Sequence, residues 1–354
     1  MAGCRITVGA VAGRLDEVAG YAGVSLATAS RVLNGRPGVA EGTRRAVLAA
    51  VDVLGYQRPA VLAQRRIGLV GLVVAELDNP VFPLFAQALE RALSAFGYGA
   101  LLSTRQFGLP AEQASIELLR EHGVAGLVFV SGVHSDTHAD PEDYVRLREQ
   151  RIPLAFINGY IPELDATFVA DDDAAGMDAV VRHLVALGHD HIGLATGPIR
   201  YTPSARKLAG FQAAMSAHAP HARAEHHVGD YSLESGRVAA IDLVGRGCTA
   251  VVGASDFTAL GAIRGVRSLG LDVPGDVSVT GYDGSSLMEF TDPPLTGLRQ
   301  AVDRLASGAV RSLIEDIEGS PRSGTELLYQ PELIVRASTG PPPASGNGGS
   351  QPPG

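Results

Sequence analysis

The stretch AGVSLATASRVLNG, residues 22–35, places small polar side chains and one cation at spacings suited to contacting a DNA duplex. The guanidinium of Arg31 can donate two parallel hydrogen bonds to O6 and N7 of a guanine. Leu26 and Ala27 are apolar and can contact thymine methyl groups. Nearby hydroxyl, phenol and amide groups can hold phosphates: Tyr21, Ser25, Thr28, Ser30 and Asn34. This chemistry is compatible with DNA binding, and an ordinary helical hairpin would show the same general pattern equally well.

The charge of the chain is distributed unevenly. Residues 1–66 carry nine Arg against four acidic residues, so this part has a charge of +5 and the remainder −14, within a total of −9. A small basic head on an acidic body is the balance expected when only the head meets a polyanion. An arbitrary local excess of arginine is the alternative interpretation, because charged runs are often only solvated faces.

Two helices joined by a tight turn are expected to position these groups. Apolar residues recur at helical spacing at Leu15, Val18, Ala19 and Ala22. Gly23 then allows a sharp reversal, and Ser25 is a good N-cap for a second helix over about 26–33. A third amphipathic helix follows from about Glu41. The pattern predicts a helix-turn-helix head.

From residue 67 onward, β-branched runs alternate with amphipathic segments. We expect strands at 67–74, 99–104, 126–132, 153–158, 191–197, 250–255 and 277–283. We expect helices at roughly 84–96, 111–122, 141–150, 174–187, 204–217, 233–246 and 257–269. This alternation favours parallel sheets in two α/β halves.

The sequence argues against several classes of protein. No apolar run is long enough to cross a bilayer and the N-terminus lacks a signal pattern, so we expect a cytoplasmic protein. Cys4 and Cys248 lie far apart and are interpreted as free thiols. The Asp run at 171–173 and the His pairs at 189–191 and 226–227 lack metal-ligand spacing, so no metal or other cofactor is expected. No nucleophile, phosphate-loop or dinucleotide motif is present, so no catalytic residue is assigned.

The string LDEVAGYAGVSLATASRVLNG closely resembles the head of the LacI (lactose repressor-type) family of bacterial transcription factors. The resemblance continues through LVGLVVAELDNPVFP, HLVALGHDHIGLATGP and ASDFTALGAIRGVRSLGLDVPGDVSVTGYD, and it covers about residues 14–338. It implies an α-helical DNA-binding head, a hinge, and an α/β core similar to periplasmic sugar-binding proteins. That core has two doubly wound parallel-sheet subdomains, between which the chain crosses three times.

The resemblance and the composition divide the chain into four parts. They are a head at 1–57, a short hinge at 58–66, an effector-binding core at 67–338 and a disordered tail at 339–354. Within the core we expect an N-subdomain of about 67–158 plus 294–323, and a C-subdomain of about 159–293 plus 324–338. The hinge is about one helical turn shorter than usual, and Leu62 is its candidate wedge for the DNA minor groove.

Carried over position by position, the base-reading positions of the family fall on Leu26, Ala27 and Arg31. Its other DNA-facing positions fall on Leu15, Asp16, Tyr21, Thr28, Ser30, Asn34 and Thr43. Ala29 replaces the usual Val, which is expected to loosen the packing of the head.

The resemblance also implies ligand contacts in a cleft of the core, at Phe82, Asp171, Lys207, Ser255, Asp256 and Asp283. Arg206 lies beside Lys207, and one of these two cations is expected to grip the ligand. The set suits a sugar, because carboxylates and short polar groups bond hydroxyls while the Phe82 ring stacks on the apolar face. Asp173 is expected to cap the helix that follows Asp171.

We therefore expect a sequence-specific transcriptional regulator, a repressor, that binds operator DNA as a homodimer and has no membrane partner. A small-molecule effector, a sugar or sugar derivative, would control it allosterically from the cleft. Two alternatives stay open. One is a pure sugar-binding module whose head contacts other proteins, and the other is an enzyme acting on sugars, for which no motif is found.

Overall fold

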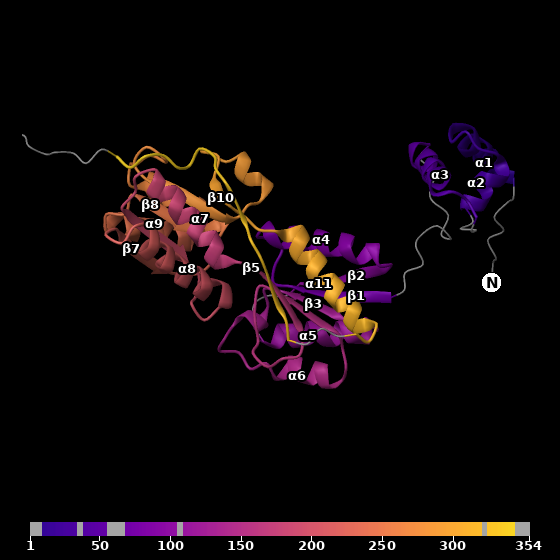
Figure 1. The fold of residues 1–354 in the computed structure, drawn as a ribbon, viewed down its shortest axis with the longest axis horizontal. Helices are drawn as coiled ribbons and strands as arrows, with labels where there is room; N and C mark the ends of the chain where they lie inside the picture. The colour runs from indigo at the N-terminus through magenta and orange to yellow at the C-terminus, as the bar shows by residue number, and fades with distance from the viewer. Residues whose placement is uncertain (1–8, 34–37, 55–67, 105–108, 321–323, 344–354) are drawn as a thin grey trace, which may run out of the picture. The chain divides into compact units, whose positions relative to one another are not determined.

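The described part of the N-terminal head has three helices, α1 Gly9–Tyr21, α2 Leu26–Leu33 and α3 Glu41–Val53 (Figure 1). The structure is a computed structural model and describes residues 9–33, 38–54, 68–104, 109–320 and 324–343. The chain divides into two units, Met1–Gly68 and Leu69–Gly354, and each is described by itself.

The helices of the head enclose a small apolar core. Its buried side chains are Val18, Ala19, Ala29, Val32, Val47, Ala50 and Val51. Gly23 has a φ of +65°, which lets the chain reverse between α1 and α2. The Ser25 hydroxyl accepts the backbone N–H of Thr28 at 3.2 Å and so caps α2. The first helix begins at Gly9, well before the apolar spacing that starts at Leu15.

Two six-stranded sheets form the frame of the core. The first has the order β11-β5-β4-β3-β1-β2, with β1 Gly68–Val74, β2 Tyr98–Thr104, β3 Leu127–Val130, β4 Leu154–Ile157, β5 Thr167–Asp171 and β11 Glu326–Tyr329. The second has the order β12-β10-β9-β8-β6-β7, with β6 His191–Thr196, β7 Arg223–Val228, β8 Ala250–Gly253, β9 Ser278–Asp283, β10 Thr296–Arg299 and β12 Glu332–Ile334. Strand β12 is antiparallel to β10, whereas β3, β4 and β5 pair in parallel, as do β6, β8 and β9. The inner strands are buried apolar runs, because helices cover both of their faces.

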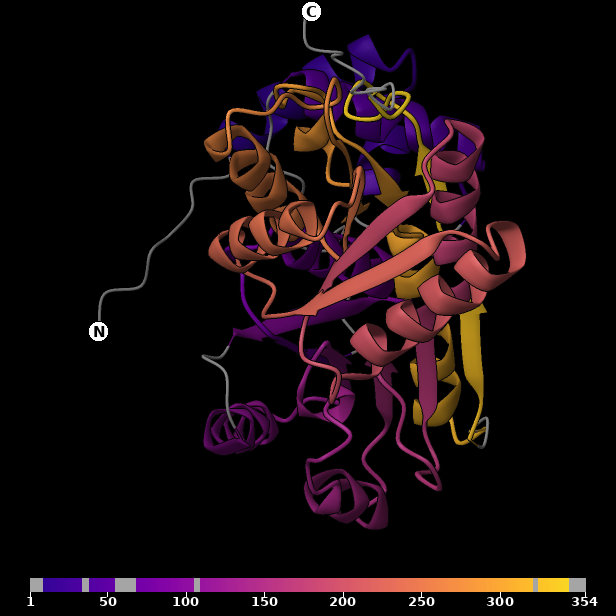
Figure 2. The same cartoon turned by 90° about the vertical axis from the view of Figure 1, so that its left-hand side faces the viewer.

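Each sheet is covered by helices on both faces. Helices α4 and α11 cover one face of the first sheet, and α5 and α6 cover the other. Helices α7 and α8 cover one face of the second sheet, and α9 and α10 cover the other. Their bounds are α4 Val81–Ala95, α5 Leu109–Glu121, α6 Glu142–Glu149, α7 Asp173–Ala186, α8 Thr202–His218, α9 Leu233–Gly245, α10 Asp256–Ser268 and α11 Val302–Ile317. Figures 1 and 2 both show α11, late in the sequence, beside the strands of the first sheet. No helix in the described ranges has both the length and the apolar character needed to cross a membrane.

The chain passes between the two sheets after β5, after β10 and after β11. The expected subdomain boundaries near residues 158, 293 and 323 are therefore wrong. Strand β5 stays in the first sheet because it continues the parallel pairing of β4, with Phe168 opposite Phe156. Strand β10 likewise pairs with β9 before the chain leaves the second sheet, and β11 pairs with β5 in the first.

The first residues of the expected disordered tail are held against the second sheet. Thr339 Oγ1 lies 3.0 Å from His183 Nε2, and the Gly340 N–H donates to Ser278 Oγ at 3.0 Å. The Gly340 carbonyl also lies 2.9 Å from His189 Nε2. The prediction of disorder from residue 339 is wrong for these residues, because side chains of α7, of the loop before β6 and of β9 bond them. Residues 344–354 lie outside the described part of the chain.

Candidate functional site

One face of α2 is exposed and carries the residues expected to read bases. The Leu26 side chain is 46% exposed, and Ala27 and Arg31 are exposed as well. Ala29 and Val32, on the other face, are fully buried in the head. Ala29 thus packs into the core of the head. The outward face has the few short side chains and the single guanidinium with which a helix can contact base edges.

The other residues expected to face DNA differ in how far they are exposed to solvent. Tyr21 is 61% exposed and Asp16 is exposed, whereas Ser30 and Thr43 are half-buried. Leu15 is half-buried against the apolar core of the head, so part of its side chain serves packing.

Two of the expected phosphate contacts also stabilise the helix. The hydroxyls of Ser25 and Thr28 lie 2.8 Å apart, and Ser25 accepts the N–H of Thr28. These hydroxyls therefore cap α2 as well as facing outward from its first turn. The remaining expected contacts, Asn34 and Leu62, lie outside the described residues.

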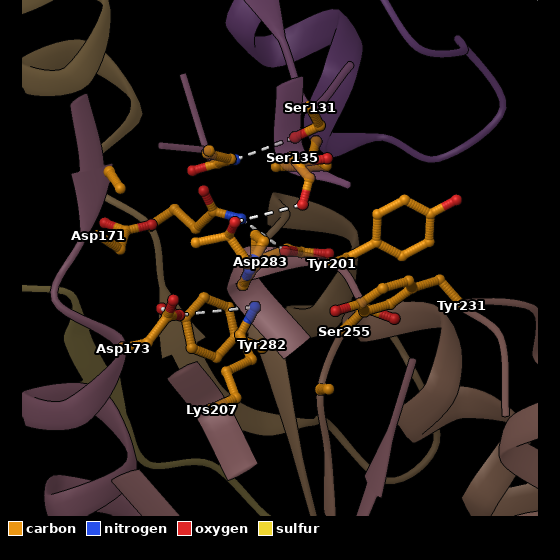
Figure 3. A pocket seen from close by; sticks show the side chains of 18 of the residues that line it. Ser131, Ser135, Asp171, Asp173, Tyr201, Lys207, Tyr231, Ser255, Tyr282 and Asp283 are labelled. Carbon is orange, nitrogen blue, oxygen red and sulfur yellow. Dashed lines mark hydrogen bonds and ion pairs between the residues drawn. The ribbon is translucent and has the colours of Figure 1, made fainter. Parts of the chain in front are cut away.

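A cavity opens between the two subdomains of the core, at the carboxyl ends of their strands (Figure 3). Six of the seven expected ligand contacts line it, namely Phe82, Asp171, Arg206, Lys207, Ser255 and Asp283. Cavities in open α/β sheets take ligands at this edge. The cavity therefore has the position of a small-molecule site.

A buried cation lies deep in this cavity. Lys207 is the only lysine of the sequence and its side chain is 7% exposed. Its Nζ lies 3.6 Å from Asp173 Oδ1 and 3.9 Å from the centre of the Tyr282 ring (Figure 3). The Tyr282 hydroxyl donates to the same Asp173 oxygen at 2.9 Å. Burial alone would lower the pKa of Lys207, but the nearby Asp173 carboxylate raises it well above its ordinary value, so the ammonium keeps its charge.

The expected role of Asp173 as a helix cap is wrong. The N-cap of α7 is Asp172, whose carboxylate accepts the N–H of Ala175 at 3.0 Å. Asp172 has the non-helical backbone that a cap requires, with φ −75° and ψ 85°, whereas Asp173 is the first helical residue. The Asp173 side chain is therefore free to turn toward Lys207.

Three buried oxygen atoms of the cavity walls have no hydrogen-bond partner among the described residues. They are Asp171 Oδ2, Asp283 Oδ2 and Gln300 Oε1. The other oxygen of each carboxylate is held in place. The Ala301 N–H donates to Asp171 Oδ1 at 3.2 Å, and Gln300 Nε2 donates to Asp283 Oδ1 at 2.7 Å. Burial raises the pKa of Asp171 to about 7 and that of Asp283 to about 6. Acceptors of this kind are costly to leave unpaired.

The residues at the start of α10 serve mainly the protein itself. Ser255 lines the cavity, but it caps the helix by accepting the N–H of Thr258 at 3.1 Å, and Thr258 Oγ1 accepts the N–H of Ser255 at 2.9 Å. Asp256 does not line the cavity, in contrast to expectation. Its carboxylate accepts the N–H of Ser285 at 2.9 Å and so fixes the loop after β9. Burial, together with the neighbouring Asp283, raises the pKa of Asp256 to about 8.

Several polar and aromatic residues of the cavity were not expected from the sequence. Gln300 and the rings of Tyr201 and Tyr231 line it together with Ser131 and Asn158 (Figure 3). The Tyr231 hydroxyl lies 2.7 Å from Ser204 Oγ, which fixes the ring. With the half-buried Phe82, these rings provide apolar faces beside the polar acceptors. The signal for them was weak, because each comes from a loop between elements.

The described residues contain no group of three or more His, Cys, Asp or Glu that could hold a metal ion. His189 is buried and bonded to Thr249 Oγ1 at 2.8 Å and Ser278 Oγ at 2.9 Å. Cys248 is buried and free, and burial raises its pKa to about 12. Its thiol is therefore unreactive at neutral pH. Cys4 lies outside the described residues.

Comparison with known proteins covers both units of the chain. Residues 14–59 match the family described as bacterial regulatory proteins, lacI family, and residues 181–339 match a periplasmic binding protein-like domain. The regulator MalR of Streptomyces coelicolor is 51% identical over 336 residues, which cover 93% of this chain and 97% of that protein. The chain belongs to the LacI family.

Solved structures of LacI-family proteins have the same fold. A structure described as a transcriptional regulator CelR–cellobiose complex has a TM-score of 0.69 at 30% identity, and covers 92% of this chain and 99% of its own. The lac repressor dimer bound to operator and an anti-inducer has a TM-score of 0.67 at 29% identity, covering 91% and 98%. This LacI-family chain is thus a DNA-binding transcriptional regulator, with a helix-turn-helix head and a periplasmic-binding-protein-like core for a small-molecule effector.

Proposed function

We propose that this regulator is a repressor that binds its operator as a homodimer and whose affinity for DNA changes when a sugar occupies the cleft. The observation that carries the sugar effector is the set of buried, unpartnered acceptors on Asp171, Asp283 and Gln300. A sugar presents several hydroxyl donors around an apolar ring, and so can satisfy these oxygens while it packs against Phe82 and the tyrosines. The CelR–cellobiose complex, similar in fold, supports a sugar in this cleft.

On DNA, the exposed face of α2 is proposed to enter the major groove. Arg31 would bond a guanine, and Leu26 and Ala27 would contact thymine methyls. The residues proposed to hold the DNA phosphates are Tyr21, Ser25, Thr28, Ser30 and Asn34. Leu15, Asp16 and Thr43 would also face the DNA, and Leu62 would enter the minor groove. The operator-bound dimer of the lac repressor supports a two-fold arrangement, in which paired heads contact a pseudo-palindromic site.

We propose that the protein acts by binding DNA and its effector, without catalysing a reaction. We also propose that it acts in the cytoplasm, where its DNA target lies. Its cavity holds carboxylates, but Asp171 and Asp283 are fixed through main-chain or amide groups and no activated nucleophile accompanies them among the described residues. The relatives are named as transcriptional regulators, which supports action by binding and not by catalysis.

A direct test measures binding to the DNA upstream of the protein's own gene by gel shift, with and without each member of a panel of sugars. Sugars are first chosen by thermal shift, since a ligand that binds only the folded state raises the melting temperature. We expect a specific complex whose midpoint moves when a stabilising sugar is added. The absence of a specific complex, with or without sugar, would instead support a sugar-binding module that lacks DNA recognition.

A further inference from the structure

Two loops, one from each subdomain, are bonded to each other beside the cavity. Residues 133–137 follow β3 of the first sheet, and residues 200–202 lie where the chain passes from β6 of the second sheet into α8. Asp136 and Tyr201 form an antiparallel bridge between them. Tyr201 also lines the cavity, so the bridge lies at its edge (Figure 3). These two loops together are named the clasp.

Hydrogen bonds hold the clasp on both sides of this bridge. The Thr137 N–H and the Thr137 hydroxyl both donate to the Arg200 carbonyl, at 2.8 and 2.9 Å. The Thr202 hydroxyl donates to the Ser135 carbonyl at 3.2 Å. The Arg200 guanidinium lies 3.3 Å from the Asp136 carboxylate, but the Arg200 side chain is 50% exposed, so water weakens this ion pair. The clasp therefore depends mainly on neutral hydrogen bonds of modest net strength, which can break and re-form as the subdomains move.

A buried carboxylate anchors the clasp to the first subdomain. Glu112 of α5 is 3% exposed and accepts the Val133 N–H at 3.1 Å. Its other oxygen accepts the hydroxyl of Tyr144, and the Tyr144 oxygen in turn accepts the His134 N–H at 3.0 Å. Two successive N–H groups of the loop are thus bonded by one side chain, directly and through Tyr144. This anchor fixes the loop in the conformation that presents its tip to the second subdomain.

The clasp joins the two walls of the cavity directly. Both subdomains line the cavity, so a ligand that enters or leaves along this edge has to break the bonds of the clasp. We propose that the clasp is a gate of the effector site, and that Glu112 is a positioning residue that holds the gate in place. This inference rests on the proposed sugar effector and adds the step that limits its entry and release. Glu112 does not line the cavity, so it acts through the clasp and not by touching the effector.

The first test locks the clasp with a disulfide. Opposite residues of an antiparallel pair have Cα atoms about 4.5–5.5 Å apart, which a disulfide can span. Asp136→Cys and Tyr201→Cys are combined with Cys4→Ser in the full-length protein, in which Cys248 is buried. Binding of glucose, galactose, maltose and cellobiose is followed by stopped-flow tyrosine fluorescence, since the sequence has no Trp. We expect the oxidised protein to bind and release a sugar about tenfold or more slowly than the same protein after reduction.

The second test weakens the anchor without changing the walls of the cavity. Glu112→Gln keeps the shape but replaces one of the two acceptor oxygens with a donor. It should raise the association and dissociation rates together, about three- to tenfold, at an unchanged dissociation constant. A site that is only distorted would instead lose affinity through faster dissociation alone. The matched control Glu117→Gln, exposed on the same helix, should leave both rates unchanged.

A third variant guards against a folding defect in Glu112→Gln. Thr137→Val removes one hydrogen bond of the clasp itself and should also raise both rates, by about twofold or more. Equal rates in the oxidised and reduced protein, or unchanged rates in both Glu112→Gln and Thr137→Val, would overturn the gate. If none of the four sugars binds the unaltered protein, the proposed sugar effector is contradicted and the gate falls with it.

Discussion

The head and the cleft carry their proposed recognition groups in opposite ways. In the head they project from α2 into solvent, as the exposed Arg31 does. In the cleft Asp171, Lys207 and Asp283 are buried and come from three separate elements, β5, α8 and β9. DNA is read from outside by a few projecting side chains, whereas a small ligand has to be surrounded. The cleft therefore carries a cost in stability that the head avoids, and a ligand relieves part of it.

The largest expected difference between the two regions is in folding stability. Lys207→Met removes the buried cation and leaves the Asp173 carboxylate uncompensated, which should lower the free energy of unfolding of the core by about 3–5 kcal/mol. The matched Arg31→Met in the head should change stability by only about 0.5 kcal/mol, because the side chain is exposed. Urea denaturation of both variants gives the comparison. Equal losses would contradict the assignment of a buried ion pair.

The pH dependence of stability should also arise in the cleft. Burial raises the pKa of Asp171 from 3.8 to about 7, so the folded state retains a proton that the unfolded state releases. Stability of the ligand-free protein should therefore fall as pH rises from about 4 to 7, by up to about 4 kcal/mol for this group. Melting temperatures across this range should show a smaller fall in Asp171→Asn. A difference between the two proteins that does not vary with pH would contradict the raised pKa.

A substitution that removes the charge of one acceptor tests whether the cleft binds the sugar. Asp283→Asn retains the shape and tolerates the φ of +101° at this position, but bonds a sugar hydroxyl less strongly. Loss of a charge-assisted hydrogen bond costs about 1.5–3 kcal/mol, so sugar affinity should fall about 10- to 150-fold. Titration calorimetry measures this, with operator affinity in the absence of sugar as the control that should not move. Unchanged sugar affinity would remove Asp283 from the site.

The smallest expected effect distinguishes two kinds of contact within the head. Arg31→Ala should weaken operator binding by about 1–3 kcal/mol and relax the preference at one base pair. Arg45→Ala removes an exposed cation of α3, and any loss there should be equal for all DNA sequences. Fluorescence anisotropy with an operator series separates these results. If Arg31→Ala weakens every sequence equally, Arg31 contacts phosphate and not a base.

The head could be predicted from the sequence almost completely, because its signals are local. Gly23, Ser25 and the apolar spacing lie within one short stretch, and α2 has the predicted bounds. The cleft is different, because its residues meet only through the fold. The resemblance located Asp171, Lys207 and Asp283, but it could not show that Gln300 lines the same cavity.

The errors in the core have physical causes. Asp171, Asp172 and Asp173 are chemically identical, so only the backbone decides that Asp172 caps α7. Strands β10, β11 and β12 are three or four residues long and have no clear alternation, so they could not be assigned to a sheet from their sequence. Helix α11 was missed although its buried Leu305, Ala309 and Leu313 recur at helical spacing, so that signal was available.

The most direct test of the account is a linkage measurement with the sugar identified by thermal shift. Operator affinity is measured without sugar and with saturating sugar, and sugar affinity is measured without operator and with saturating operator. We expect each ligand to change the affinity of the other by the same factor, about 5- to 150-fold, as coupling between two sites requires. Operator affinity that stays constant while the cleft is saturated would contradict the claim that the cleft controls the head.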